Sequence, residues 1–262
     1  MTTPDDSPQQ RSLAARLRDR ERVIGFWQVL PCAPVSERMA MLGYDYVGLD
    51  LQHGLIDDAS CLQMVTAIDA GRSAAVVRVP DHNAAKLGWA LDIGAAAVLV
   101  PMVNTADDAR AIVSALRYPP RGVRSYGPQR ASLRLTGDLA LLESEVACIV
   151  MIETAHGLDN VNEIAATDGV DALYVGPSDL AIGLGISPRP RQALATNPIF
   201  LDALARIRAA ADASSKASGI HCVDAEMASE YLGQGFTFAT TASDAVSLET
   251  FAKDALMTLR RG

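Results

Sequence analysis

Two acidic residues near the middle of the chain have the spacing that a metal site would need. Glu153 follows the apolar run 147–152, Asp179 follows the run 172–175, and the two acids are 26 residues apart. That spacing is close to one strand–helix unit, so it would set both carboxylates on neighbouring strand ends. Anionic oxygen ligands suit a hard divalent cation such as Mg²⁺ or Mn²⁺. The pair therefore predicts a metal site; the alternative is that Glu153 pairs with an arginine and Asp179 caps the turn into Leu180.

A histidine, an arginine and a third acid could supply proton transfer and charge stabilisation. His53 follows the apolar run 46–51, and Arg78 lies at the end of the next such run. An imidazole can act as a general base, and a guanidinium carries a permanent charge suited to a developing oxyanion. Asp92 could orient the imidazole, as carboxylates do for catalytic histidines. The alternatives are a structural histidine and an acid at the end of a surface helix.

Further arginines and a second histidine leave two interpretations open. The connection 118–145 contains four arginines, namely Arg121, Arg124, Arg130 and Arg134. They indicate either a solvated loop or subunit contact, or an anion site for a carboxylate substrate. His221 ends another apolar run, where it belongs either to the same pocket or to the packing of the core.

Composition and motifs exclude several classes of protein. Of the 262 residues 49% are hydrophobic, and the formal net charge of −8 disfavours non-specific binding to nucleic acid or anionic lipid. The chain has no phosphate-binding P-loop, no nucleophile elbow and no His-Glu-x-x-His zinc helix. Its longest uncharged runs are about half the ~20 residues that a membrane span needs.

The compartment that the sequence predicts is the cytoplasm. The N-terminal residues MTTPDDSPQQ have neither the basic region nor the apolar region of a secretory signal. The four cysteines, Cys32, Cys61, Cys148 and Cys222, lie far apart and lack the spacing of a zinc or redox site. Free thiols in a reducing compartment are expected.

Eight short apolar runs alternate with longer stretches of helical spacing, which is the pattern of β/α units around a parallel sheet. The expected strands are 23–27, 46–51, 75–79, 97–100, 147–152, 172–175, 217–221 and 236–240. The expected helices are 34–42, 57–70, 84–92, 107–116, 157–166, 198–213, 225–232 and 243–259. Eight units predict an α/β protein with a single (β/α)₈ barrel. An open doubly wound sheet would require a glycine-rich turn after the first strand, and Phe26-Trp27-Gln28 is not one.

Two parts of the chain are expected. Residues 1–20 form a polar tail and a short charged helix that could cap the floor of the barrel, and residues 21–262 form the barrel itself.

Six segments of the chain, in order, resemble the metal-dependent (class II) pyruvate aldolases of the 4-hydroxy-2-oxoheptanedioate aldolase and citrate lyase β-subunit superfamily. The segments read GYDYVGLDLQHGL, VVRVP, ALDIGAAAVLVPMV, RYPPRGVR, MIET and YVGPSDLAIGLG, and the match runs from about Gly25 to Thr241. The resemblance implies a (β/α)₈ barrel of the phosphoenolpyruvate/pyruvate type, in agreement with the independent count of strands.

By that resemblance Glu153 and Asp179 hold a divalent cation, Mg²⁺, Mn²⁺ or Co²⁺, which binds pyruvate through its carboxylate and keto oxygens. Lewis-acid polarisation then acidifies the methyl group. His53, positioned by Asp92, is the implied base that forms the enolate and the acid that protonates the new alkoxide. Arg78 is implied to stabilise the enolate oxygen.

The resemblance also implies a substrate pocket. Trp27 flanks it, and the backbone N–H groups of Ser178 and Asp179 bind the carboxylate of pyruvate. The segment that lines this pocket consists of Gly176, Pro177, Ser178 and Asp179.

The implied activity is the reversible formation and cleavage of 4-hydroxy-2-oxoacids from pyruvate, or a close 2-oxoacid, and an aldehyde. A symmetric homo-oligomer, commonly a hexamer, is implied as well, with the last helix packed on a neighbour. The amphipathic spacing of 243–259 is equally compatible with closure of its own barrel.

Two positions depart from the pattern of this superfamily. Gln52 stands where many members have Glu, and Met151 stands where Gln is common. Two alternatives follow from these departures and from the shared enolate chemistry. One is a lyase or decarboxylase that acts on oxaloacetate or an acyl-CoA thioester, and the other is a 2-oxoacid-binding barrel without turnover.

Overall fold

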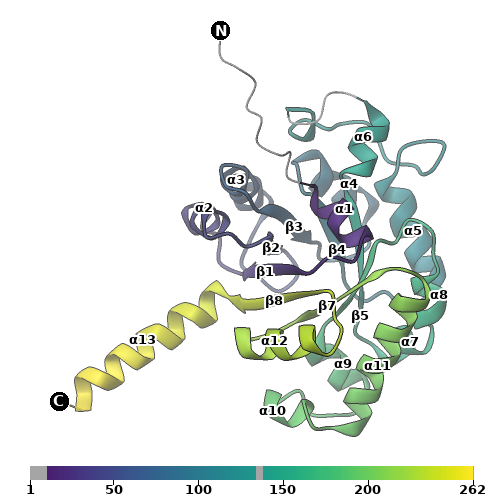
Figure 1. The fold of residues 1–262 in the computed structure, drawn as a ribbon. Helices are drawn as coiled ribbons and strands as arrows, with labels where there is room; N and C mark the ends of the chain where they lie inside the picture. The colour runs from purple at the N-terminus through teal and green to yellow at the C-terminus, as the bar shows by residue number, and fades with distance from the viewer. Residues whose placement is uncertain (1–10, 134–137, 262) are drawn as a thin grey trace.

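A closed barrel of eight parallel strands forms the centre of the molecule (Figure 1). The computed structural model describes residues 11–133 and 138–261. Each strand pairs with its neighbours in chain order, and β8 closes the barrel by pairing with β1. The strands are β1 Val23–Gln28, β2 Tyr46–Asp50, β3 Ala74–Arg78, β4 Ala97–Val100, β5 Ala147–Ile152, β6 Ala172–Val175, β7 Ala217–His221 and β8 Phe238–Ser243. The predicted (β/α)₈ fold is confirmed.

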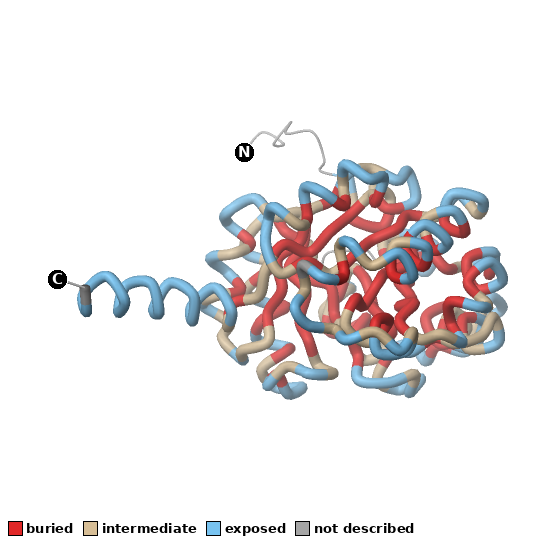
Figure 2. Tube along the Cα trace, turned by 90° about the horizontal axis from the view of Figure 1, so that it is seen from below, coloured by how far each residue is buried: buried red, intermediate tan, exposed pale blue. Residues whose placement is uncertain are grey.

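Helices surround the barrel, and the chain is buried at the centre and exposed at the rim (Figure 2). Those that follow strands β1 to β4 are α2 Ala33–Met41, α3 Asp58–Ile68, α4 Ala84–Asp92 and α5 Ala106–Leu116. The later ones are α6 Leu139–Ser144, α7 Ala155–Asp159, α8 Val161–Ala165, α9 Pro177–Gly183, α10 Arg191–Leu194, α11 Pro198–Ala213, α12 Ala225–Gly233 and α13 Asp244–Arg261. Helices α2 to α5, α11 and α12 pack against the outer side of neighbouring strands.

The strands read as unbroken apolar runs because both of their faces are buried. Val77 on β3 packs outward against the helices, whereas its neighbour Val76 packs inward with Leu99, Ile149 and Phe238. Side chains therefore fill the barrel, which is a packed core rather than a pore.

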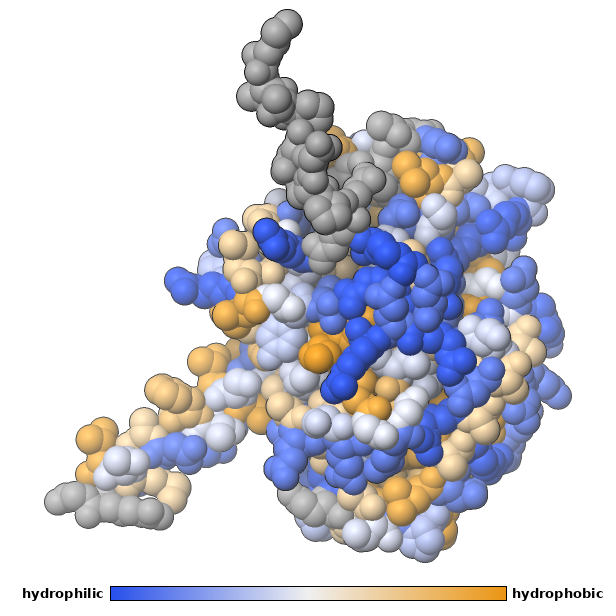
Figure 3. All heavy atoms as spheres, in the orientation of Figure 1, coloured by the Kyte–Doolittle hydropathy of each residue, from blue (hydrophilic) through white to orange (hydrophobic). Residues whose placement is uncertain are grey.

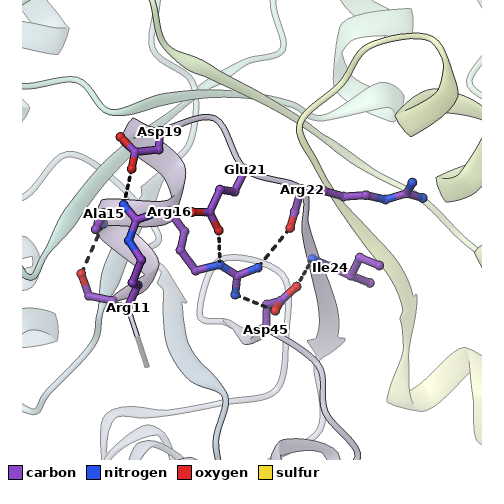
Figure 4. A network of polar contacts seen from close by, with 9 residues as sticks. Arg11, Ala15, Arg16, Asp19, Glu21, Arg22, Ile24 and Asp45 are labelled. Atoms are coloured by element: carbon purple, nitrogen blue, oxygen red, sulfur yellow. Dashed lines mark hydrogen bonds and ion pairs between the residues drawn. The ribbon is translucent and has the colours of Figure 1, made fainter. Parts of the chain in front are cut away.

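Helix α1, Leu13–Arg18, covers the end of the barrel where the strands begin. Leu13, Ala14 and Leu17 are buried in the same cluster as the inward side chains of the strands. Arg16 fastens the helix by donating hydrogen bonds to Glu21 and to Asp45 (2.6 Å to Asp45 Oδ1), as Figure 4 shows. The predicted cap over the barrel floor is present in residues 12–18, while residues 1–10 of the predicted tail lie outside the described residues.

The predicted elements differ from the structure mainly around the later connections. The helix expected over 157–166 is two short helices, because the chain leaves helical geometry at Asn160. Strand β8 begins at Phe238 rather than Phe236 and runs to Ser243. Helices α9 and α10 were not predicted, since their seven and four residues are too short to show a helical period.

Helix α13 projects away from the barrel and packs on it only at its first turn (Figures 1 and 2). Asp244 anchors this first turn by accepting hydrogen bonds from the backbone N–H groups of Val29 (3.0 Å) and Leu30 (3.2 Å). Of the two arrangements that the sequence left open, α13 therefore does not close its own barrel.

Replacing Gly219 by alanine tests how tightly the barrel interior is packed. A Cβ atom there would lie 2.3 Å from the ring of Phe238, which is buried and cannot move aside. Overpacking of this kind costs about 1–3 kcal/mol, so Gly219→Ala should lower the free energy of unfolding by that amount in urea denaturation.

The matched control is Gly88→Ala in the middle of α4, where a Cβ atom would meet nothing within 4 Å. Because glycine costs a helix interior about 0.5–1 kcal/mol relative to alanine, this variant should be slightly more stable than the wild type. Equal effects of the two substitutions would contradict the described packing.

Candidate active site

The side chains that follow the strand ends meet in one cavity of about 250 Å³ at the mouth of the barrel. Every predicted site residue except Asp92 lines this cavity. The lining includes Trp27, His53, Arg78, Glu153, Gly176, Pro177, Ser178 and Asp179. Strand order explains the convergence, because parallel strands of a barrel all end at the same face.

A buried ion pair between Asp50 and Arg78 lies at the centre of the mouth. Arg78 Nε donates to Asp50 Oδ1 over 2.9 Å and Arg78 Nη2 donates to Asp50 Oδ2, so the pair is bidentate. The side chains of Asp50 and Arg78 are 2% and 11% exposed. Their strands pair so that residue 50 stands opposite residue 78, which brings the two groups together without a loop.

Asp50 also organises the residues on either side of it. Its carboxylate accepts hydrogen bonds from the backbone N–H groups of Gln52 and His53, both over 3.0 Å, and from Trp27 Nε1 over 3.3 Å. Burial alone would raise the pKa of Asp50, but the hydrogen bonds and charge of Arg78 and the two backbone donors outweigh it. The pKa of Asp50 therefore lies below its ordinary value, and the carboxylate stays charged.

Trp27 and Arg78 form one wall of the cavity. The guanidinium carbon of Arg78 lies 5.2 Å from the centre of the Trp27 ring. A cation over an aromatic face is stabilised by the ring quadrupole. The predicted pocket position of Trp27 agrees with this arrangement.

Glu153 is buried with half of its carboxylate unused. Glu153 is 1% exposed. Its Oε1 accepts a hydrogen bond from the backbone N–H of Met102 over 2.8 Å, whereas Oε2 has no partner among the described residues. Burial, with a smaller contribution from Asp179, raises the pKa of Glu153 to about 7, against the opposing Met102 hydrogen bond. A buried carboxylate oxygen without a partner is costly unless a cation or a donor arrives.

The backbone around Glu153 leaves that buried oxygen without a protein partner. Met102 adopts a positive φ of 56°, which is uncommon outside glycine and turns its N–H toward Oε1. On the other side a Cβ atom at Gly176 would lie 2.3 Å from Oε2, so only glycine leaves space there. Met102 thus fixes Oε1, and the missing side chain of Gly176 leaves room beside Oε2.

The donor set fits a hard divalent cation. Asp179, in the first turn of α9, is half-buried and lines the same cavity as Glu153. Over residues 11–133 and 138–261, no group of three or more His, Cys, Asp or Glu side chains is arranged to hold a metal. Two carboxylates with open positions are nevertheless what Mg²⁺ accepts, since it commonly keeps several waters and binds through one or two protein carboxylates.

His53 follows β2 on an exposed loop and faces the same cavity. Its backbone is held by Asp50, whereas no hydrogen bond of its imidazole is present among the described residues. The ring is therefore free to approach a substrate from the solvent side of the mouth.

The structure does not bring Asp92 to His53, which it was predicted to orient, within this chain. Helix α4 ends at Asp92 and leads into the beginning of β4, whereas His53 follows the end of β2, so the two lie at opposite ends of the barrel. Asp92 instead forms an ion pair with the buried Arg124 over 2.7 Å. Asp92 lies at the floor because each helix runs from the end of one strand back to the level where the next strand begins.

The described arginines of the connection 118–145 each pair with an acid, which favours a structural role over an anion site. Arg121 pairs with Glu143, Arg124 with Asp92, and Arg130 with Asp69. They lie at the floor, where a second cavity of about 330 Å³ is lined by charged side chains of α1 and of the strand beginnings. Arg134 lies outside the described residues.

Two residues of the mouth complete the site. His221, whose role the sequence left open, lines the cavity with its ring 5.3 Å from that of Trp27 and Nδ1 3.5 Å from Tyr174 Oη. Burial, together with Arg191 and Arg78, lowers the pKa of His221 to about 3, so the ring is neutral. Sequence reasoning missed Arg191 entirely, and the only available signal was the pair of arginines in PRPR after β6.

Comparison with known proteins identifies the family. The profile described as HpcH/HpaI aldolase/citrate lyase matches residues 24–250. The chain belongs to this family. A hydroxypyruvate/pyruvate aldolase from Rhizorhabdus wittichii is 38% identical over 235 residues, which cover 89% of this chain and 92% of that protein.

Two further relatives agree. A 4-hydroxy-2-oxovalerate aldolase from Novosphingobium aromaticivorans is 38% identical over 257 residues, 95% of this chain and 94% of that protein. The crystal structure of an HpcH/HpaI aldolase/citrate lyase family protein from Burkholderia cenocepacia has a TM-score of 0.86 at 34% identity, covering 95% of this chain and 98% of that one. These names confirm the expected family and the expected class of carbon–carbon lyase.

The two departures noted in the sequence both lie at the mouth of this aldolase-family barrel. Met151 is buried in the cavity lining, and Gln52 has a buried Oε1 without a partner among the described residues. Among the described residues, neither side chain forms a hydrogen bond with Glu153 or with the Asp50–Arg78 pair. No described helix has both the length and the apolar composition to cross a bilayer.

Replacing Asp50 by asparagine tests the ion pair at the centre of the mouth. The substitution keeps the shape of the side chain but leaves Arg78 as an unpaired buried charge, which should cost about 3 kcal/mol of unfolding free energy in urea denaturation. Because the pKa of Asp50 is lowered in the folded state, its stabilisation is present above the ordinary aspartate value of 3.8 and is lost as the pH falls below it.

As the pH falls below 3.8, the free energy of unfolding of the wild type should therefore decrease more steeply than that of Asp50→Asn. The control is Asp107→Asn, which removes an exposed partner of Arg110 and should leave stability unchanged. An Asp50 variant as stable as this control would show that the pair contributes nothing.

Proposed function

We propose that this protein catalyses the reversible aldol addition of pyruvate, or a close 2-oxoacid, to an aldehyde, giving a 4-hydroxy-2-oxoacid. The observation that carries the proposal is the unpartnered buried oxygen of Glu153, which opens into one cavity with Asp179, Arg78 and His53. An acceptor for a cation, a fixed positive charge and a free imidazole are the groups that enolate chemistry requires. The activities named for the relatives are of the same class.

The residues that would hold the metal are Glu153 and Asp179. A bound divalent cation, Mg²⁺, Mn²⁺ or Co²⁺, would polarise the keto group of pyruvate and make its methyl protons more acidic. The unpartnered Glu153 Oε2 supports this assignment, because the absence of a side chain at Gly176 leaves room beside it while the Met102 backbone binds only Oε1.

The remaining steps belong to the side chains of the mouth. An imidazole nitrogen of His53 takes a proton from the methyl carbon of pyruvate, and the electron pair moves toward the keto oxygen. Arg78, held in position by Asp50 and stacked on Trp27, stabilises the negative charge on that oxygen. The methylene carbon then attacks the aldehyde carbonyl, and His53 returns the proton to the new alkoxide.

Pyruvate is oriented by two further groups in this proposal. The backbone N–H groups of Ser178 and Asp179 would bind its carboxylate, as the family resemblance implies, at the beginning of α9. The Gly176-Pro177 segment supports this placement because it lines the cavity beside Glu153.

Exchange of the methyl protons of pyruvate for deuterium tests the first half of the reaction without any aldehyde. The wild type with Mg²⁺, Mn²⁺ or Co²⁺ in D₂O should exchange, as followed by proton NMR, and His53→Ala should lose exchange by about 100-fold or more because the general base is removed. No exchange by the wild type with any of the three metals would exclude the proposed function.

Two controls separate base, ligand and nonspecific effects. Glu153→Gln should weaken both Mn²⁺ binding, followed by calorimetry, and exchange, whereas His53→Ala should weaken exchange alone. His156 is exposed and outside the cavity, so His156→Ala should exchange like the wild type. Pyruvate binding without exchange would instead indicate the non-catalytic 2-oxoacid-binding barrel.

We also propose that α13 packs against a second copy of the chain. Its large apolar side chains include Leu248, Phe251 and Leu259, which are 58%, 77% and 80% exposed, and Figure 3 shows apolar side chains along its length. Exposed apolar surface on this scale marks an interaction site. Because Asp244 anchors only the first turn, a neighbouring barrel is the surface available to the rest of α13.

Placing charge on the apolar face of α13 should dissociate the oligomer. The double variant Leu248→Glu with Phe251→Glu puts two carboxylates where burial is expected and should lower the molar mass measured by light scattering after gel filtration. Thr250, on the opposite side of α13, supplies the control Thr250→Glu, which should retain the wild-type mass. A monomeric wild type would contradict the proposal.

A cytoplasmic location is part of the same proposal. The four cysteines, Cys32, Cys61, Cys148 and Cys222, are all unpaired, which supports a reducing compartment.

A further inference from the structure

His221 is a second histidine at the mouth, and the proposed reaction of pyruvate does not use it. His221 ends β7 and lines the 250 Å³ cavity, and it also lines an adjoining cavity of about 720 Å³ that extends toward the first turn of α13. Its ring and that of Trp27 pack edge to face, with the planes at 76° and the centroids 5.3 Å apart. This packing restricts the imidazole at the boundary of the two cavities.

A chain of hydroxyl groups below the mouth holds one nitrogen of the His221 ring. Tyr46 Oη lies 2.9 Å from Thr240 Oγ1, which is also hydrogen-bonded to Tyr174 Oη. Tyr174 Oη in turn lies 3.5 Å from His221 Nδ1. Tyr46, Tyr174 and Thr240 are buried, and burial raises the pKa values of both tyrosines above their ordinary range. All three hydroxyl groups therefore keep their protons.

The number of protons in this chain decides the direction in which its hydrogen bonds run. Each hydroxyl group has one proton to donate, and a neutral imidazole has one N–H group and one accepting nitrogen. If Tyr46 donates to Thr240, Thr240 to Tyr174, and Tyr174 to His221 Nδ1, every proton of the three hydroxyl groups has an acceptor. In the opposite direction the Tyr46 proton has no acceptor, because Thr240 is the one hydrogen-bond partner of Tyr46 Oη among the described residues. A buried donor without an acceptor is destabilising, so the first direction is favoured.

The proton of the imidazole is therefore on Nε2. Burial, together with Arg191 and Arg78, lowers the pKa of His221 to about 3, so the ring has a single proton near pH 7. Because Nδ1 accepts from Tyr174, this proton belongs to Nε2. Nε2 has no hydrogen bond to a described residue and is not one of the buried atoms without a partner, so it is accessible from the cavities that His221 lines. The mouth thus contains an N–H donor that no described protein group uses.

We propose that His221 donates a hydrogen bond from Nε2 to the carbonyl oxygen of the aldehyde during the aldol addition. The inference rests on the proposed function and adds a catalytic group to it. When the methylene carbon forms its bond to the aldehyde carbon, the π electrons of the aldehyde carbonyl move to the oxygen, which becomes an alkoxide. A preorganised donor stabilises this developing charge. His221 keeps its proton, and the alkoxide receives the proton that His53 took from the methyl group, so no further reactant is needed.

The position of His221 favours the aldehyde over pyruvate as the acceptor of this hydrogen bond. The groups assigned to pyruvate, Glu153, Asp179 and Arg78, line the 250 Å³ cavity. The described residues that line the 720 Å³ cavity include His221 but none of these three. An aldehyde that occupies the larger cavity and turns its carbonyl carbon toward pyruvate places that carbonyl at the boundary where His221 lies.

The variants His221→Phe and His221→Gln separate the hydrogen-bond donor from the shape of the ring. Phenylalanine keeps an aromatic ring beside Trp27 but has no donor, whereas the amide of glutamine retains an N–H group. Addition of pyruvate to propanal, an uncharged aldehyde, is measured together with the aldehyde-free deuterium exchange of pyruvate. His221→Phe should lower the ratio of addition to exchange by about 100-fold, the effect of removing one donor to an oxyanion. His221→Gln should recover about tenfold of that loss because it restores a donor.

The control for the loss of a histidine is His156→Phe, which changes an exposed residue outside the cavity and should keep the wild-type ratio. Equal losses of addition and exchange in His221→Phe would overturn the inference, because they would assign His221 to pyruvate or to the shape of the mouth. A His221→Phe variant with the wild-type rate of addition would overturn it as well.

The position of the proton is tested without any turnover. Nitrogen-15 NMR of histidine-labelled protein should show His221 with a protonated Nε2 and an unprotonated Nδ1 between about pH 6 and 8, the signal being assigned by its loss in His221→Gln. Tyr174→Phe removes the donor to Nδ1 and should shift part of the population to the other tautomer. Tyr118→Phe is the matched control, because the buried hydroxyl group of Tyr118 has no partner among the described residues.

This measurement separates the inference from the proposed function. A wild type that exchanges the protons of pyruvate but has its His221 proton on Nδ1 would refute the inference alone. A wild type with the proton on Nε2 and no exchange would refute the proposed aldol reaction, and with it the donation to an aldehyde, while the chain of hydroxyl groups would stand.

Discussion

The buried pair of Asp50 and Arg78 is the contact on which the mouth of the barrel depends. Neither charge would be stable there alone, because removing an ion from water costs more free energy than contacts with neutral neighbours supply. Together they join β2 to β3, hold the indole of Trp27 and fix the backbone at His53. The functional groups are thus placed by strands and by one carboxylate rather than by flexible loops, which is how a rigid site is preorganised.

Around this neutralised pair, two groups of opposite sign are left unsatisfied. Glu153 keeps a carboxylate oxygen without a partner, and Arg191 keeps a guanidinium nitrogen without one. Two backbone features accompany the unpartnered oxygen of Glu153. Met102 adopts a left-handed backbone conformation, and residue 176 is a glycine, which has no side chain. At the mouth, a left-handed residue and a glycine thus border the unpartnered oxygen of Glu153, where a cation is expected.

The other end of the barrel shows the contrast. There the arginines and acids of α1 and of the long connection pair with one another, and apolar side chains of α1 close the floor. Ion pairs of this kind stabilise the floor, although Arg117 Nη1 and Arg124 Nε there also lack a hydrogen-bond partner among the described residues. The same residue types therefore have different roles at the two ends of the strands.

The sequence by itself determined the repeating units and the family. Hydrophobic period, segment length and the order of motifs can be read along the chain without knowing how the side chains pack. It also predicted that Glu153, Asp179, Arg78 and His53 meet at one end of the barrel, since each lies at or just after the end of an apolar run and parallel strands bring such ends together. Only the tertiary structure decided the partners of charged groups. The floor holds Asp92 and the described arginines of the long connection, and the mouth holds Arg191. The direction of the chain decides at which end of the barrel a charged residue lies, and the neighbours at that end decide whether it is neutralised.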